Sequence, residues 1–241
     1  MPTPVAFDPA IGAEFLLTAR RLVARGYVHN TLGNIAMRAA HPDHPGGVAY
    51  TKHASISLEE MTAANIVITD LPTGKLLYGT RITSVGHNLN REVLRLRPDI
   101  NAAIHVHDDA TIGFLASGAF KEVRMLSADT PLILGKPPHY VPGHINVEVD
   151  VATVKDFIAG TNLIVLVGHG ITALGRTLSE AYHRLNSFTA EVRRNVIAEQ
   201  LAAAKGTKVE VRSDAEVAEM YRMADRVVYP ERASNVMGGT K

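Results

Sequence analysis

A short apolar run that ends in two histidines constrains this chain more than any other feature. The run reads Asn-Ala-Ala-Ile-His-Val-His over residues 101–107. Side chains alternate between the two faces of a strand, so His105 and His107 should project to the same side, while Ile104 and Val106 face the other. The run therefore predicts a buried strand, and its two imidazoles would form half of a metal site.

A second apolar run, about sixty residues later, offers the other half of that site. Residues 162–171 read as a strand that stops at Gly168-His169-Gly170. The flanking glycines let the backbone turn and bring one imidazole close to the strand ends. Three neutral imidazoles suit Zn, Mn, Fe or Co with positions left open for a substrate. The simpler interpretation, in which each histidine is a hydrogen-bonded residue at a strand end, stays open from spacing alone.

Composition excludes several classes of function. The 241 residues, 46% of them hydrophobic, are most simply one domain over residues 1–241. With 25 basic and 24 acidic residues and no basic run, nucleic acid is not an expected partner. There is no cysteine, and no apolar run approaches a membrane span. The N-terminus lacks the pattern of a signal peptide, so we expect a cytoplasmic protein without a membrane partner.

Periodicity and turn residues predict the order of the elements. Helical spacing of apolar residues marks the ranges 8–25, 84–96, 111–117, 150–159, 177–204 and 213–227, and a capping box at Ser57 to Glu60 predicts one more short helix. Strands are expected after the polar turn at 30–34, in a hairpin with 48–53, and at 64–71 and 75–78. The proline-rich span 122–149 should be largely strand and loop. The tail from about residue 229 has little to anchor it and is expected to be mobile or to close over a neighbouring subunit.

Three motifs together resemble the class II aldolase/adducin family. They are the Asn-Thr-Leu-Gly-Asn turn at 30–34, the Arg-Pro-Asp stop at 97–99 before the HxH strand, and the Gly-His-Gly turn. The resemblance spans residues 15–193 and implies an α/β fold, a three-layer αβα sandwich with a largely antiparallel central sheet. It also implies a homotetramer or higher oligomer with sites at subunit interfaces. One divalent metal per subunit (Zn, Mn, Fe or Co) would be held by His105, His107 and His169.

The chain departs from that family at the residue that matters most for function. Sugar-phosphate members carry a metal-binding, proton-shuttling glutamate at the start of the helix before the HxH strand, and its expected place falls on Gly86. Glycine offers no group that can accept or return a proton. His87, one position along, is one candidate for the missing role. His53 and a tyrosine of the adjacent subunit, Tyr221 or Tyr229, are the other candidates for the proton donor.

The anion pocket is altered as well. Thr31, Asn34 and Ser84 match family positions that hold a phosphate, but the family's Thr-Gly pair reads Thr-Lys-His-Ala over residues 51–54. A planar carboxylate paired by Lys52 or His53 would fit this pocket better than a phosphate held by backbone amides. The alternative is that Lys52 and His53 are solvent-exposed at a strand end.

These departures favour decarboxylation, which needs no base to deprotonate carbon. A metal on three histidines could bind a hydroxyl and its adjacent carboxylate and stabilise the charge that develops when CO2 leaves. The predicted substrate is a small hydroxylated aromatic or heteroaromatic dicarboxylate such as 3,4-dihydroxyphthalate, with its second carboxylate on Asn34, Ser84 and the Lys52–His53 pair. The alternative is a sugar-phosphate aldolase, epimerase or dehydratase of the same family. A non-catalytic, adducin-like binding protein is a third interpretation.

Overall fold

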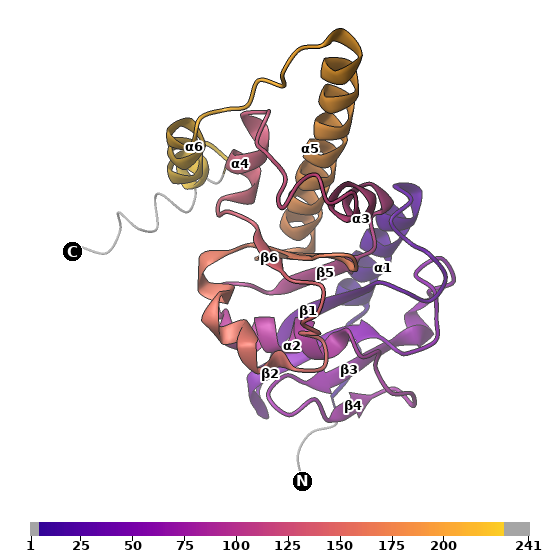
Figure 1. Cartoon of the computed structure of the whole chain (residues 1–241). Coiled ribbons are helices and arrows are strands. Elements are labelled where there is room, and N and C mark those ends of the chain that lie inside the picture. Colours follow the sequence, from indigo (N-terminus) through magenta and orange to yellow (C-terminus); the bar gives the residue numbers. More distant parts are fainter. Residues whose placement is uncertain (1–4, 229–241) are drawn as a thin grey trace, which may run out of the picture.

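One eight-stranded sheet, with helices on both of its faces, forms the centre of the computed structural model, which describes residues 5–228 (Figure 1). The strands lie in the order β4-β3-β2-β1-β5-β8-β7-β6. Every neighbouring pair is antiparallel except β6 with β7, which is parallel. The predicted αβα sandwich with a largely antiparallel sheet is confirmed. The strands are β1 (Asn34–His41), β2 (His44–Lys52), β3 (Ile66–Asp70), β4 (Leu76–Tyr78), β5 (Ala102–Val106), β6 (His139–Val141), β7 (Leu163–Leu166) and β8 (Gly170–Gly175).

Alternating side chains of the strands build a separate core on each face of the sheet. Ile104 and Val106 pack with residues of α1 and α5 such as Phe15 and Phe188, whereas Ala103 packs on the opposite face with α2 and the 3-10 helices η2 and η3. The helices are α1 (Pro9–Ala24), α2 (His87–Leu96), α3 (Asp109–Ala116), α4 (Asp129–Leu134), α5 (Leu178–Lys205), α6 (Asp214–Val227), η1 (Ala63–Asn65), η2 (Val151–Asp156) and η3 (Ile158–Gly160). His105 shares its parity with Ala103, so its ring lies on the α2 face.

The predicted helices at 8–25, 84–96, 111–117, 177–204 and 213–227 are present with shifted ends, and two local predictions were wrong. The range 150–159 forms two 3-10 helices rather than an α-helix. No helix starts at Ser57, although one half of the expected capping box is present: the backbone N–H of Ser57 donates to Glu60 Oε2 at 3.3 Å. The span 122–149 is largely loop with the short strand β6, as predicted. It also contains helix α4, which its prolines concealed because Pro131 lies within the first turn, where proline is tolerated. The predicted tail from about residue 229 lies outside the described residues.

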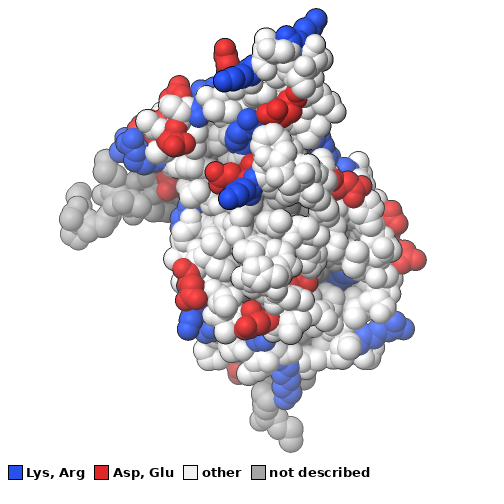
Figure 2. Space-filling view, in the orientation of Figure 1, with Lys and Arg blue, Asp and Glu red and all other residues white. Residues whose placement is uncertain are grey.

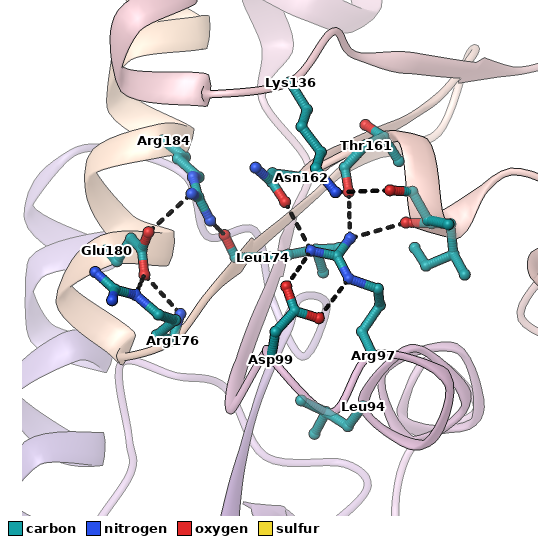
Figure 3. A network of polar contacts seen from close by, with 12 residues as sticks. Leu94, Arg97, Asp99, Lys136, Thr161, Asn162, Leu174, Arg176, Glu180 and Arg184 are labelled. Carbon is teal, nitrogen blue, oxygen red and sulfur yellow. Dashed lines mark hydrogen bonds and ion pairs between the residues drawn. The ribbon is translucent and has the colours of Figure 1, made fainter. Parts of the chain in front are cut away.

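A buried arginine, Arg97, fixes the C-terminal end of α2. Arg97 donates to both carboxylate oxygens of Asp99 at 2.7 Å, and to the carbonyls of Ile158 and Thr161 at 2.8 and 2.7 Å (Figure 3). A further bond at 3.1 Å reaches the side chain of Asn162, directly before β7. The helix is thus tied to the strand that leads into the Gly-His-Gly turn, and its N-terminal end is positioned relative to the three histidines.

Charges of both signs are interspersed over the face that Figure 2 shows. Within residues 5–228, no helix combines the length and the apolar character needed to cross a membrane.

Candidate metal centre

Strand register determines how His105 is presented. His105 lies on β5 between two antiparallel partners, opposite Asn34 of β1 and Thr172 of β8. Its Nδ1 lies 2.9 Å from the hydroxyl oxygen of Thr172. The ring is buried, so this contact fixes its orientation and leaves Nε2 to face the end of the strand.

The other two imidazoles converge on that nitrogen. The Nε2 atoms of His105 and His107 are 2.9 Å apart, and each of the three histidines offers a ring nitrogen within 4.8 Å of the others. The ring centroids lie 4.9–5.2 Å apart, with the rings nearly perpendicular in every pair. The structure thus brings together the three histidines that the two sequence motifs predicted. It also places the half-exposed His169 ring on the open side of the cluster.

Electrostatics favour the neutral imidazoles that a metal ion requires. Burial lowers the pKa of His105 well below its ordinary value, and the neighbouring His107 and His169 lower it further. Burial, followed by His169 and His29, lowers the pKa of His107 to about 4. His105 and His107 therefore resist protonation, and with the ring of His169 beside them they form a donor set that fits a divalent transition metal.

Glycine is required on one side of this cluster for steric reasons. A Cβ atom at Gly170 would lie 2.4 Å from the carbonyl oxygen of Val106 and 3.3 Å from the rings of His105 and His107. On the other side of His169, Gly168 has a φ of +77°, in the left-handed region. The predicted role of these glycines, to let the chain turn and bring His169 to the strand ends, agrees with this geometry.

A carboxylate that the sequence analysis did not identify faces the histidines. Glu148 Oε1 lies 3.9 Å from His105 Nε2, and Glu148 Oε2 lies 3.7 Å from His169 Nε2. The Glu148 side chain is 12% exposed. Burial raises the pKa of its carboxyl group, and His169 partly opposes that shift. Glu148 belongs to an irregular segment between β6 and η2, where a single acidic residue carries no periodic signal that could have pointed to the site.

Of the neutral residues of the predicted anion pocket, Asn34 lies next to the cluster, opposite His105 in the sheet. Asn34 faces the turn before α2, where its Nδ2 atom would contact any side chain at position 86, and its Oδ1 accepts a hydrogen bond from Asn90. The Ser84 hydroxyl in that turn is buried and has no hydrogen-bond partner among the described residues. Thr31 is exposed in the turn before β1. Asn34 and Ser84 therefore remain candidates for holding an oxyanion.

Lys52 lies inside the protein rather than at its surface. It is fully buried, and its Nζ donates to the carbonyls of Thr31 and Ile56, both at 2.6 Å. Burial lowers its pKa to about 8. The ammonium group links two loops, and these two bonds use two of its three N–H donors. Burial rules out the alternative of a solvent-exposed Lys52, and its role in substrate binding stays a prediction.

Neither of the two histidines predicted to be catalytic makes a contact with the cluster in this chain. His87 is buried against the sheet, with Nε2 3.0 Å from the hydroxyl oxygen of Thr69 on β3. His53 Nδ1 donates to the carbonyl of Ala54 at 2.5 Å, which leaves Nε2 to accept from Asn65 at 3.2 Å. His53 also lines a polar cavity of about 290 Å³ with residues such as Ser55, Asn65, Thr80 and Arg81.

Of the two predicted tyrosines, Tyr221 lies on α6 and lines a cavity with Tyr140, and Tyr229 lies outside the described residues. Whether either acts in a neighbouring subunit stays a prediction.

Comparisons with known proteins agree with this fold. A family model described as "Class II Aldolase and Adducin N-terminal domain" matches residues 13–193. The L-fuculose phosphate aldolase of Methanococcus maripaludis is 26% identical over 172 residues, 70% of this chain and 87% of that protein. The β-adducin of Rattus norvegicus is 27% identical over 158 residues, which are 64% of this chain and 21% of that protein. The structure of YgbL from Klebsiella pneumoniae superposes with a TM-score of 0.72 at 17% identity, covering 90% of this chain and all of YgbL.

Proposed function

Because the chain belongs to the class II aldolase and adducin family, we propose that it is a divalent-metal-dependent carbon–carbon lyase acting on a small molecule. The observation that carries the proposal is the convergence of His105, His107 and His169, each with a ring nitrogen within 4.8 Å of the others. These residues would hold the metal, which supplies a Lewis acid that polarises an oxygen next to the bond that breaks. The three imidazoles orient that centre, and Thr172 holds the His105 ring in place.

Within this class, we infer that the reaction is an aldol-type cleavage of a hydroxylated oxo compound bearing an anionic group. The predicted dicarboxylate would place its second carboxylate on Asn34, Ser84 and the Lys52–His53 pair, but Lys52 is buried and already donates to two carbonyls. The neutral Asn34 amide and the unpartnered Ser84 hydroxyl suit the oxygens of a phosphate ester. Similarity to L-fuculose phosphate aldolase over 87% of that protein supports the same substrate class.

Decarboxylation of a hydroxylated aromatic or heteroaromatic dicarboxylate is the second candidate. One observation favours it: position 86, where the family's sugar-phosphate enzymes are expected to carry glutamate, is glycine. Loss of CO2 leaves an electron pair on carbon without prior deprotonation, so that reaction would tolerate the change. Aldolase, epimerase and decarboxylase are the named candidate activities of the YgbL protein, which shares the fold.

The non-catalytic alternative follows from the similarity to β-adducin, of which this chain spans about a fifth. Retention of all three histidines, with the ring of His105 oriented by Thr172, favours an enzyme over a binding module. We further propose a homotetramer with the sites at subunit interfaces. The 37% exposure of the His169 side chain supports this arrangement, because it leaves the cluster open at the surface of the single chain.

A panel of substrates tests the proposal. Metal-reconstituted protein is offered ketose 1-phosphates, with aldehyde release measured, and ortho-hydroxy dicarboxylates, with CO2 release measured. His105→Ala is the control. Metal-dependent aldehyde release that disappears in the control supports the aldolase, and CO2 release supports the decarboxylase. Metal-loaded protein that cleaves neither class would contradict the proposed lyase.

A further inference from the structure

The turn before α2 leaves room for a group that comes from elsewhere in the chain. A Cβ atom built on Gly86 would lie 2.6 Å from Glu148 Oε1 and 2.4 Å from Asn34 Nδ2. Real Cβ atoms essentially never approach a neighbour closer than 3.0 Å. A side chain at position 86 and Glu148 in its present position therefore exclude each other.

The segment that carries Glu148 is anchored to the same helix end. The Asn88 side chain, in the first turn of α2, donates to the carbonyl oxygen of Glu148 at 3.3 Å. The backbone N–H of Glu148 donates to Asn146 Oδ1 at 3.1 Å, and Val147 is buried in the core on the α2 face. These contacts direct the Glu148 side chain toward the histidines.

The distances between Glu148 and the imidazoles suit a shared ion better than direct hydrogen bonds. At 3.7 and 3.9 Å, the carboxylate oxygens are too far from the Nε2 atoms of His169 and His105 for hydrogen bonding. Two ligand atoms that each lie about 2.1 Å from one ion in tetrahedral geometry are separated by roughly 3.4 Å. A small rotation of the carboxylate would therefore let one oxygen and the ring nitrogens bind the same metal.

We propose that Glu148 is a fourth ligand of the metal centre, delivered from the segment between β6 and η2 into the space that Gly86 leaves open. The proposal rests on the proposed function for the presence of the metal. It adds that the carboxylate which sequence comparison misses at position 86 is supplied from position 148. Carboxylate oxygen joins histidine nitrogen in many divalent-metal sites, and here it would reduce the net charge of the centre by one.

Metal affinity, measured without any substrate, tests this assignment. Chelator-treated full-length protein is titrated calorimetrically with Zn²⁺, and Co²⁺ absorption reports the coordination. Glu148→Gln should bind Zn²⁺ at least about tenfold more weakly than the wild type and change the Co²⁺ spectrum. The matched control, Glu210→Gln, alters an exposed glutamate and should match the wild type.

Substitutions at position 86 provide a second test of the same assignment by Zn²⁺ titration. Gly86→Ala should weaken Zn²⁺ binding by a similar factor because its methyl group displaces the carboxylate, and the double variant with Glu148→Gln should be no weaker than either single variant. Gly86→Glu in the Glu148→Ala background should recover part of the affinity if one carboxylate can enter the site from either direction.

One result would overturn the assignment of Glu148. This is a Glu148→Gln protein with an unchanged circular dichroism spectrum that binds Zn²⁺ as tightly as the wild type and gives the same Co²⁺ spectrum. That result leaves the three-histidine centre standing. The proposed function fails separately if His105→Ala also binds Zn²⁺ as tightly as the wild type. Should Gly86→Ala not fold, the comparison of Glu148→Gln with Glu210→Gln still decides the assignment.

Discussion

The two sides of the metal centre are built in different ways. On the sheet side, His105 is held between strands β1 and β8, and its ring contacts Thr172 directly opposite. On the loop side, Glu148 belongs to an irregular segment that is attached to α2 through the Asn88 side chain. Ladder hydrogen bonds thus fix the backbone of His105 before a metal binds, whereas a few local contacts position the carboxylate. The sheet side should therefore dominate metal affinity, and the loop side should tune it.

Removing one of the three histidines, on the strand or directly after it, should have the largest effect. His107→Ala should weaken Zn²⁺ binding by about 1,000-fold, since structural sites of four ligands bind with about 10–16 kcal/mol in total. Calorimetric titration against His183→Ala, an exposed histidine on α5, checks this expectation. A loss no larger than that of Glu148→Gln would reverse the proposed ranking of the two sides.

Acid should weaken the packing between α2 and the sheet through His87. Burial, assisted by Arg91, lowers the pKa of His87 to about 4, below the value of 6.5 that it has when exposed. The unfolded chain therefore binds more protons between pH 6.5 and 4, so stability is full above that window and falls as pH drops through it. The loss that His87 contributes should reach about 3 kcal/mol at most.

Denaturant unfolding at pH 7, 5.5 and 4.5 measures that loss. His87→Gln cannot titrate, so its stability should fall less steeply with acid than that of the wild type. Other buried histidines, including His105, titrate in both proteins and cancel in the comparison. Parallel pH profiles for the two proteins would show that His87 is not held neutral in the folded state.

Loss of the group that orients His105 should have an intermediate effect. Thr172→Val keeps the shape of the side chain and removes the hydroxyl that contacts His105 Nδ1. Zn²⁺ affinity should fall about 10- to 100-fold, the usual effect of removing a partner that orients a ligand. Titration of Thr172→Ser, which retains a hydroxyl, should recover most of the affinity. If the Thr172→Ser and Thr172→Val variants bind Zn²⁺ with the same affinity, the contact of the Thr172 hydroxyl with His105 does not contribute to metal binding.

The smallest effect should come from the anchor of the loop side. Asn88→Ala removes the hydrogen bond from the Asn88 side chain to the Glu148 carbonyl and leaves the carboxylate in place. Zn²⁺ affinity should drop by about threefold, since a partly exposed hydrogen bond contributes about 0.5–1.5 kcal/mol. In the Glu148→Gln background, Asn88→Ala should not lower Zn²⁺ affinity any further. An equal drop there would show that Asn88 does not act through the Glu148 carboxylate.

Sequence reasoning predicted the sheet side well because strand periodicity carries spatial information. In residues 101–107, the two-residue period of a strand puts His105 and His107 on the same face, and the Gly-His-Gly turn contributes the third imidazole. The αβα fold followed from the family resemblance and is confirmed. Glu148 could not be predicted, because an irregular segment has no period from which to read the direction of a side chain. The burial of Lys52 was not predicted for a related reason: a cation at a strand end gives no sign of the two loop carbonyls to which it donates.

The most direct measurement is a crystal structure of the Zn²⁺- or Mn²⁺-loaded protein with anomalous data collected at the metal edge. We expect one anomalous peak per subunit, with nitrogens of His105, His107 and His169 and one oxygen of Glu148 within about 2.0–2.3 Å of it. A peak bound by the three histidines while Glu148 points away would contradict the fourth ligand. A metal bound elsewhere, with the histidines unoccupied, would contradict the centre itself.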